Sequence, residues 1–280
     1  TDTFGGTPLV LAEYGLADKA IAINEAAARI ARDVAEEMER GDGRARFVAG
    51  SMGPTTRTIS VTGGITFDEM ASHYEQQALG LLQGGADVLL VETSIDTLNT
   101  KAALVGIERA EAKLAVDVPL MLSCTIEAMG TMLAGQTAEA FHVSLEHAAR
   151  RPSAATGGGL VSVGLNCATG PDPMADHVRA LSAMSPFAVS CMPNAGLPDT
   201  DTGAYNETPS TLAAKLSRFM DNGFLNIVGG CCGTTPAHVR ALADAARAHK
   251  PRSIATKKRA LVSGVDAVDL DEVRPVIVGE

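Results

Sequence analysis

The chain lacks clustered basic residues and long apolar segments, and each absence argues against a class of partner. Its 280 residues include 23 lysines and arginines against 33 aspartates and glutamates, which gives a formal net charge of −10. An acidic chain without a basic patch argues against nucleic-acid binding. No apolar run approaches the roughly 18 residues that span a bilayer, and no signal-peptide pattern opens the chain. We therefore expect neither a nucleic acid nor a membrane as a partner.

Cysteine is scarce as well. The five cysteines form an odd set without the spacing of a disulfide scaffold, which favours a reducing compartment, the cytoplasm. The chain also lacks an initiator methionine, and Thr1-Asp-Thr-Phe-Gly-Gly6 is typical of a strand end that enters a loop. We expect that a first strand–helix pair is missing from this chain.

The chain does contain a repeated alternation of apolar strands and amphipathic helices. Such alternation predicts parallel strands joined by right-handed crossovers. With 46% hydrophobic residues, a chain of this length can bury one large core. The fold is interpreted as α/β, a (β/α)8 TIM barrel without its first strand–helix pair. The six predicted strands begin at Phe47, Val88, Leu120, Val161, Ala188 and Leu225.

Polar and sulfur-bearing residues follow the carboxyl ends of these strands. Glu92, Cys167, Asn194 and the pair Cys231-Cys232 all lie at such ends. In a barrel those ends share one rim, where active sites lie. An open doubly wound sheet would instead spread them along a line, so convergence of the cysteines favours the barrel.

The most informative stretch is Phe224-Leu-Asn-Ile-Val-Gly-Gly-Cys231-Cys232-Gly-Thr-Thr-Pro236. It predicts a buried strand from Leu225 to Val228, then a glycine turn that carries the two cysteines. A helix follows, with Thr234 or Thr235 as its N-cap and Pro236 at its first position. Adjacent side chains of a strand point to opposite faces, so two neighbouring sulfurs converge only where the backbone turns sharply. The helix N-terminus behind the turn favours thiolate over thiol.

A third cysteine, Cys167, lies where another predicted strand ends in a Gly-Pro turn. Three cysteine ligands with one open position are typical of a catalytic Zn²⁺ site. The residues alone leave two alternatives open, which are buried structural cysteines beside a glycine turn and a strained disulfide between neighbours. Cys124 and Cys191 lie within predicted strands, and we expect inert core thiols there. The histidines fall mostly on predicted helices and are not expected to bind metal.

Several motifs resemble those of the homocysteine S-methyltransferase family. Its zinc-site motifs are similar to Gly164-Leu-Asn-Cys167, Pro193-Asn-Ala-Gly-Leu-Pro198 and Gly229-Gly-Cys-Cys-Gly-Thr-Thr-Pro236. Further likeness lies in Thr3-Phe-Gly-Gly, Gly53-Pro-Thr, Val91-Glu-Thr, Asp96-Thr-Leu-Asn-Thr-Lys-Ala and Leu133-Ala-Gly-Gln-Thr-Ala-Glu-Ala-Phe141. The resemblance covers essentially residues 1 to 250. Within the family it is strongest to the homocysteine-binding modules of cobalamin-dependent methionine synthases.

The resemblance implies an enzyme that binds L-homocysteine, activates its thiol as a zinc thiolate and methylates it to methionine. It implies zinc ligation by Cys167, Cys231 and Cys232, with Asn194 as a displaceable fourth ligand. A turn asparagine that caps backbone groups is the alternative for Asn194. Substrate contacts are implied for Glu92, Asn166 and Thr3. For Asn166, orientation of the cysteine loop is the alternative, and it is the favoured one.

The methyl donor implied by the resemblance is methylcobalamin, carried on another module of the same polypeptide, with 5-methyltetrahydrofolate as the upstream source. No cobalamin-binding residues are expected within this chain. Residues 1–250 are predicted to form the homocysteine-binding zinc barrel and residues 251–273 a linker. Residues 274–280 resemble the start of a following folate-binding module. Residues 151–159 are predicted to form a surface insertion. The partners expected are therefore the folate-binding and cobalamin-binding modules.

One departure from the family concerns the opening strand, which in the family carries an acidic residue and a glycine-rich turn that help hold the amino acid. Neither is present here. Two other functions stay open at this point. One is a free-standing homocysteine methyltransferase that uses betaine or S-methylmethionine. The other is a non-catalytic protein in which the cysteines hold a structural zinc ion.

Overall fold

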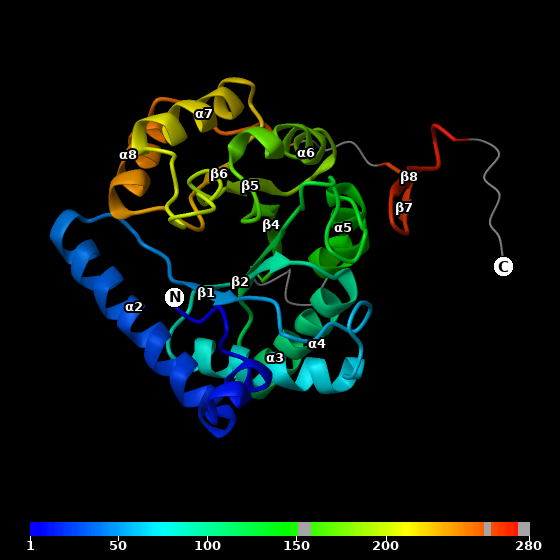
Figure 1. Ribbon diagram of the computed structural model, residues 1–280. Helices are drawn as coiled ribbons and strands as arrows, with labels where there is room; N and C mark the ends of the chain where they lie inside the picture. The colour runs from blue at the N-terminus through cyan, green and yellow to red at the C-terminus, as the bar shows by residue number, and fades with distance from the viewer. Residues whose placement is uncertain (151–157, 255–258, 274–280) are drawn as a thin grey trace. The chain divides into compact units, whose positions relative to one another are not determined.

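The computed structural model describes residues 1–150, 158–254 and 259–273 (Figure 1). The chain divides into two compact units. Unit 1 comprises Thr1–Leu122 and His147–Val161, and unit 2 comprises Ser123–Glu146 and Ser162–Glu280. The predicted insertion falls mostly, and the predicted start of a folate-binding module wholly, outside the described residues. Within the described ranges, no helix is both long enough and apolar enough to span a bilayer.

The elements of unit 1 come mainly from the first 122 residues. Its helices are α1 (Pro8–Leu11), η1 (Ala12–Tyr14), η2 (Ala17–Lys19), α2 (Ala20–Asp42), α3 (Phe67–Gln83), α4 (Thr97–Leu114) and η3 (Glu146–Arg150), of which η1 to η3 are short 3-10 helices. Its strands are β1 (Ala49–Met52), β2 (Val88–Ser94) and β3 (Pro119–Cys124), which ends just inside unit 2.

The elements of unit 2 continue the alternation and end in a hairpin. Its helices are α5 (Ala138–Leu145), α6 (Pro171–Met184), α7 (Pro209–Asp221) and α8 (Pro236–Arg247). Its strands are β4 (Gly159–Asn166), which begins just inside unit 1, β5 (Ala188–Met192), β6 (Ile227–Val228), β7 (Leu261–Ser263) and β8 (Ala267–Asp269).

The helices of unit 1 pack closely, and α3 begins at a clear capping signal. Thr66 caps α3 in a capping box, in which its N–H donates to Glu69 at 2.8 Å and Glu69 N–H donates back at 3.3 Å. Helix α3 packs against α4 on one side and α2 on the other (Figure 1). A Cβ at Gly106 would lie 2.5 Å from the carbonyl oxygen of Ala71, so only glycine lets α3 and α4 approach this closely.

The first six strands are neighbours in chain order, β1-β2-β3-β4-β5-β6. Strand β1 pairs with β2 in parallel, from Ala49 beside Val88 to Met52 beside Val91. In unit 2, β4 pairs with β5 and β5 with β6, again in parallel. This α/β sheet is the part of the predicted barrel that the structure shows, and it is typical of a partial (β/α) barrel. Closure to eight strands and a missing first pair stay predictions.

The register within unit 2 places the candidate site. Asn166 lies beside Met192 and Cys191 lies beside Val228. The residues that follow these three strands therefore emerge at one edge of the sheet. The predicted buried strand from Leu225 to Val228 is too long, because β6 comprises only Ile227 and Val228, and both are half-buried. Leu225 itself is buried, and its carbonyl oxygen accepts a bond from Arg252 N–H at 2.8 Å.

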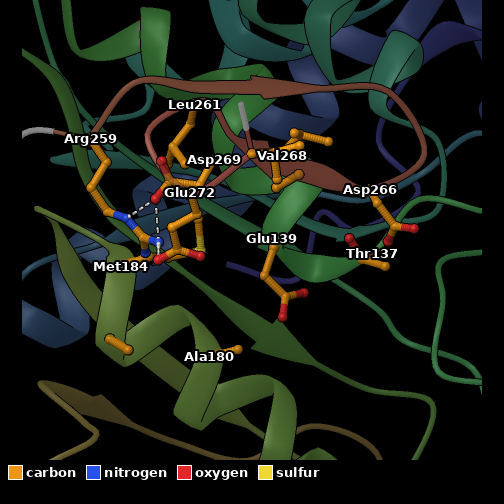
Figure 2. A pocket seen from close by; sticks show the side chains of 13 residues that line it. Thr137, Glu139, Ala180, Met184, Arg259, Leu261, Asp266, Val268, Asp269 and Glu272 are labelled. Atoms are coloured by element: carbon orange, nitrogen blue, oxygen red, sulfur yellow. Dashed lines mark hydrogen bonds and ion pairs between the residues drawn. The ribbon is translucent and has the colours of Figure 1, made fainter. Parts of the chain in front are cut away.

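A two-stranded hairpin, β7–β8, lies within the range predicted as a linker. It packs against α5, where Thr137 N–H donates to Val265 O at 2.9 Å and the Ser144 and Ser263 hydroxyls lie 2.9 Å apart. A cavity of about 650 Å³ lies between the hairpin, α5 and α6. Figure 2 shows Arg259 in this cavity, where it pairs with Asp269 at 2.5 Å and Glu272 at 3.3 Å. Because these ion pairs join residues next to β7 and residues in or just after β8, they hold the hairpin closed.

Candidate metal centre

Three cysteine sulfurs from two distant segments of unit 2 form one cluster. The Sγ atoms of Cys167, Cys231 and Cys232 all lie within 4.8 Å of one another. Cys167 Sγ and Cys232 Sγ are 3.7 Å apart, and all three thiols are free. Zn–S bonds of about 2.3 Å in a tetrahedral site place sulfurs about 3.8 Å apart. The structure thus brings the three predicted ligands close enough together to hold one metal ion.

The backbone at the end of β4 is strained where it presents the first of these sulfurs. Cys167 and Ala168 have φ values of 62° and 57°, in the left-handed region that non-glycine residues rarely adopt. Cys167 N–H donates to Met192 O at 3.2 Å, and Thr169 N–H donates to Cys167 O at 2.7 Å. Residues held in such conformations cluster at functional sites. The strained backbone thus coincides with the cluster of candidate ligands.

The turn after β6 presents the other two sulfurs. Cys231 N–H donates to Pro193 O at 2.8 Å, and Ala195 N–H donates to Cys232 O at 2.9 Å. The segment after β5 therefore lies between the two cysteine loops and bonds to the turn. Helix α8 begins directly behind it, with Thr235 as N-cap and Pro236 at the first position, as predicted.

Gly233 ends this turn, and no other residue fits there. Its φ is +76°, and a Cβ would lie 2.2 Å from the ring of Tyr205. Both the backbone conformation and the contact require glycine. Glycine at position 233 is thus a structural requirement of this turn.

The chain matches the family model for homocysteine S-methyltransferase over residues 1–246. The chain belongs to this family. Membership supports a methyltransferase activity.

Solved structures show the same fold. The chain is similar to the homocysteine methyltransferase MmuM from Escherichia coli in its metallated form, with 23% identity, a TM-score of 0.68 and coverage of 88% of this chain and 78% of that one. The oxidised form of MmuM gives 20% identity, a TM-score of 0.66 and coverage of 87% and 77%. The apo form gives 20% identity, a TM-score of 0.61 and coverage of 81% and 74%.

In this member of the homocysteine S-methyltransferase family, the cluster without metal cannot ionise fully. A hydrogen bond from Cys231 is the main cause that lowers the pKa of Cys167 to about 6. The same bond, then burial, raises the pKa of Cys231. Burial and the charge on Cys167 raise the pKa of Cys232. One thiolate thus holds the neighbouring protons in place, and three thiolates need a cation beside them. The donor set therefore fits a divalent metal ion.

Neutral side chains from neighbouring segments surround the sulfurs. The Asn166 amide donates to Cys231 Sγ at 3.8 Å, while its own oxygen accepts from Ser123 at 2.7 Å. Tyr205 lies against the turn that carries Cys232, with its ring 2.2 Å from where a Cβ at Gly233 would be. Tyr205 was not predicted, because a tyrosine in a polar loop carries no motif of its own.

Asn194 caps the cysteine turn. Its Oδ1 accepts the Cys232 N–H at 3.0 Å, and its side chain is buried. This is the contact expected from a turn asparagine that caps backbone groups. Its role as a displaceable metal ligand stays a prediction, as does substrate contact by Asn166.

The other predicted substrate residues lie in unit 1, where they share a partner. Ser51 donates to Glu92 Oε1 at 2.5 Å, and Thr3 donates to Ser51 O at 2.7 Å. Gln77 donates to Thr3 O at 2.7 Å. Thr93, the residue after Glu92, has a φ of 54° and is strained in the same way as Cys167. Contact of Glu92 and Thr3 with substrate stays a prediction, and Ser51 is an addition to the predicted set.

The remaining cysteines are core residues. Cys124 and Cys191 are fully buried. Burial raises the pKa of the Cys191 thiol to about 12 and raises that of Cys124 further. Both therefore stay protonated at neutral pH. Among the described residues, the group of candidate metal ligands that contains the three site cysteines includes no histidine.

His238 supports the turn from α8, a role that sequence reasoning missed. Its Nδ1 accepts the Thr235 N–H at 3.1 Å, and its Nε2 lies 2.9 Å from Glu207 O. Glu207 N–H in turn donates to Ala195 O at 3.0 Å. The buried ring thus ties the start of α8 to the segment after β5.

Proposed function

We propose that this chain is a zinc-dependent methyltransferase module that converts homocysteine to methionine. The observation that carries the proposal is the gathering of three free sulfurs, although Cys167 and Cys232 lie 65 positions apart in the sequence. Family membership supports the same substrate class. The metallated form of MmuM shows that a related fold takes up metal.

Cys167, Cys231 and Cys232 are the proposed ligands. When bound, zinc would keep the homocysteine sulfur as a thiolate at neutral pH, where a free thiol with a pKa of about 8.5 is mostly protonated. Three cysteine thiolates offset the charge of a dication and leave a centre of net charge −1. The ligand set therefore favours an electron-rich incoming sulfur over polarisation of a carbonyl group.

The proposed methyl transfer accounts for every bond and electron pair. The homocysteine thiol loses its proton on binding, and a lone pair of its sulfur forms the new S–CH₃ bond. The bond between the methyl group and its donor breaks, and that electron pair leaves with the donor. The product is a neutral thioether, which is a poor metal ligand and can dissociate.

The methyl donor in this proposal is methylcobalamin, held by another module of the same polypeptide. The sequence resemblance to cobalamin-dependent methionine synthases supports it. The alternative is a free-standing enzyme that uses betaine or S-methylmethionine. That alternative needs a donor pocket on this chain.

The test is an assay of the zinc-loaded protein with homocysteine and each donor in turn, with methionine as the readout. We expect methionine with methylcobalamin and at most trace product with betaine or S-methylmethionine. Cys231→Ser should abolish product and lower bound zinc from about one ion per chain to none. Cys191→Ala, which changes a core thiol, should retain both product formation and bound zinc. Turnover with S-methylmethionine alone would overturn the proposed donor, and turnover by Cys231→Ser would overturn the site.

A structural zinc site is the remaining alternative function. Structural sites normally have four protein ligands. Among the described histidine, cysteine, aspartate and glutamate residues, the group around these sulfurs contains only the three cysteines. This favours an exchangeable fourth position. X-ray absorption at the zinc edge should show one additional sulfur when homocysteine is added.

A further inference from the structure

Asn166 connects the two segments that carry the candidate metal ligands. It is the last residue of β4 and directly precedes Cys167. Its side-chain amide reaches the other segment, where Nδ2 donates to Cys231 Sγ at 3.8 Å. Asn166 is 1% exposed, so its amide is shielded from bulk water. The orientation of one buried amide therefore bears on both cysteine segments.

A serine on the neighbouring strand holds the oxygen end of that amide. Ser123 lies near the end of β3, and its hydroxyl donates to Asn166 Oδ1 at 2.7 Å. Strands β3 and β4 are neighbours in the sheet, and Ser123 is also buried. All three residues belong to unit 2. Hydrogen bonds thus run without a break from Ser123 through Asn166 to Cys231.

The chemistry of these groups permits one arrangement of the amide. A thiolate sulfur accepts hydrogen bonds and has no hydrogen to donate, so it requires the N–H end of the Asn166 amide. The oxygen end then requires a donor, which the Ser123 hydroxyl supplies. With the amide turned over, Asn166 Oδ1 would face the sulfur of Cys231. Two electron-rich atoms would then repel each other in surroundings of low dielectric constant.

The direction of this amide matters because the proposed metal centre carries excess negative charge. Three thiolates outweigh the charge of a single dication. An N–H group aimed at one sulfur stabilises that excess, and hydrogen bonds to charged groups are stronger than those between neutral groups. Partners that orient metal ligands typically change metal affinity by about 10–100-fold.

We propose that Ser123 is a positioning residue for the metal centre, because its hydroxyl fixes the Asn166 amide with the N–H end toward Cys231. The inference rests on the proposed function above. Ser123 acts through Asn166 and not as a ligand itself. Its contribution should therefore vanish when the amide is absent.

The test is a double-mutant cycle on zinc affinity, measured by competition with a chelating dye. Ser123→Ala should raise the dissociation constant for zinc about tenfold, because the amide loses the donor that orients it. Asn166→Ala should weaken zinc binding as well. In the Asn166→Ala background, Ser123→Ala should have no further effect, since residues that act as one unit are not additive.

Ser162→Ala is the matched control. Ser162 lies on β4 and is fully buried, and its hydroxyl has no hydrogen-bond partner within the described part of the chain. The control removes the same buried group without touching the amide. Ser162→Ala should therefore bind zinc as wild type does.

A spectroscopic readout separates positioning from a general loss of stability. With Co²⁺ in place of zinc, Ser123→Ala should move the sulfur-to-metal charge-transfer band to longer wavelength, because Cys231 without its hydrogen bond is a stronger donor. Ser162→Ala should leave the band where wild type has it.

An unchanged zinc affinity or an unchanged band in Ser123→Ala would overturn this inference while the proposed function stands. An equal loss of affinity from Ser123→Ala in the wild-type and Asn166→Ala backgrounds would overturn it too, since the serine would then act independently of the amide. Failure of wild type to bind zinc would overturn the proposed function and this inference with it.

Discussion

At the scale of single residues, backbone strain lies where the chemistry is proposed. Of the four described non-glycine residues with left-handed backbone, Cys167 and Ala168 form one site loop and Thr93 follows Glu92, while Ala115 ends helix α4 as its C-cap. Each such residue costs about 1–3 kcal/mol and persists only when its surroundings hold it. The hydrogen bonds around Cys167 provide that support. Strain of this kind aims a side chain at a point that regular strand geometry cannot reach.

A second residue-scale feature concerns His142, which we predict makes the fold sensitive to acid. Its ring is 1% exposed, packs edge-on against Phe187 with centroids 5.9 Å apart, and its Nδ1 has no hydrogen-bond partner in the described structure. Burial, followed by the charge of Arg252, lowers its pKa from 6.5 to about 4. Between those values the unfolded chain binds the proton and the folded chain does not.

The stabilisation that comes from keeping His142 neutral in the folded state should therefore be fully present above pH 6.5. The free energy of unfolding should fall as the pH drops toward 4. We expect a loss of about 2 kcal/mol from this group between pH 7 and 4.5, measured by urea unfolding. His142→Leu should remove that part of the pH dependence. His177→Leu, on the neighbouring helix α6, should retain it. Parallel pH profiles for wild type and His142→Leu would contradict the prediction.

At the scale of elements, the site is a junction of three loops that follow β4, β5 and β6. The middle loop bonds to both neighbours, through Asn194 N–H to Thr169 O at 3.1 Å and Cys231 N–H to Pro193 O at 2.8 Å. A shift in any one loop would therefore move the sulfurs relative to one another. The turn after β6 has the least freedom, because Gly233 lies against Tyr205.

Two glycine variants can isolate this steric constraint. Gly233 and Gly223 have similar φ values, +76° and +68°, but a Cβ at Gly223 would meet open space. Gly223→Ala should cost about 1 kcal/mol for the left-handed backbone alone. Gly233→Ala should cost several kcal/mol more, as overpacking does, and should weaken metal binding. Chemical denaturation and zinc titration measure both. Equal losses of stability in the two variants would show that the contact with Tyr205 adds no cost to Gly233→Ala.

At the scale of the whole molecule, metal and folding should be coupled. The cysteines of the site come together only in the folded chain, so zinc should bind the folded state alone. At a thousandfold excess over its dissociation constant, an ion contributes about 4 kcal/mol, which for a chain of this size is about 10 °C in Tm. A strong chelator should therefore lower the Tm of wild type by about that amount. Cys231→Ser should melt at the same temperature with or without chelator. If the chelator lowered the Tm of this variant as much as that of wild type, the ion would bind elsewhere.

Much of the local structure was predictable from the sequence. The Thr66 capping box, the Thr235–Pro236 helix start and the strand–helix alternation are all local signals, because caps and apolar periods act over a few residues. The hairpin from Leu261 to Asp269 was not predicted, since its strands are short and are stabilised by contacts with α5. The strand before Cys231 was predicted too long, because apolar character alone does not report pairing.

The sequence by itself determined the family and the three candidate ligands, since cysteines at strand ends and glycines around them form patterns that can be read along the chain. Only the tertiary structure decided that Cys167 Sγ lies 3.7 Å from Cys232 Sγ and that Tyr205 and His238 support the turn. The reason is physical. Distances between residues far apart in sequence depend on strand register and loop packing, which no local pattern encodes.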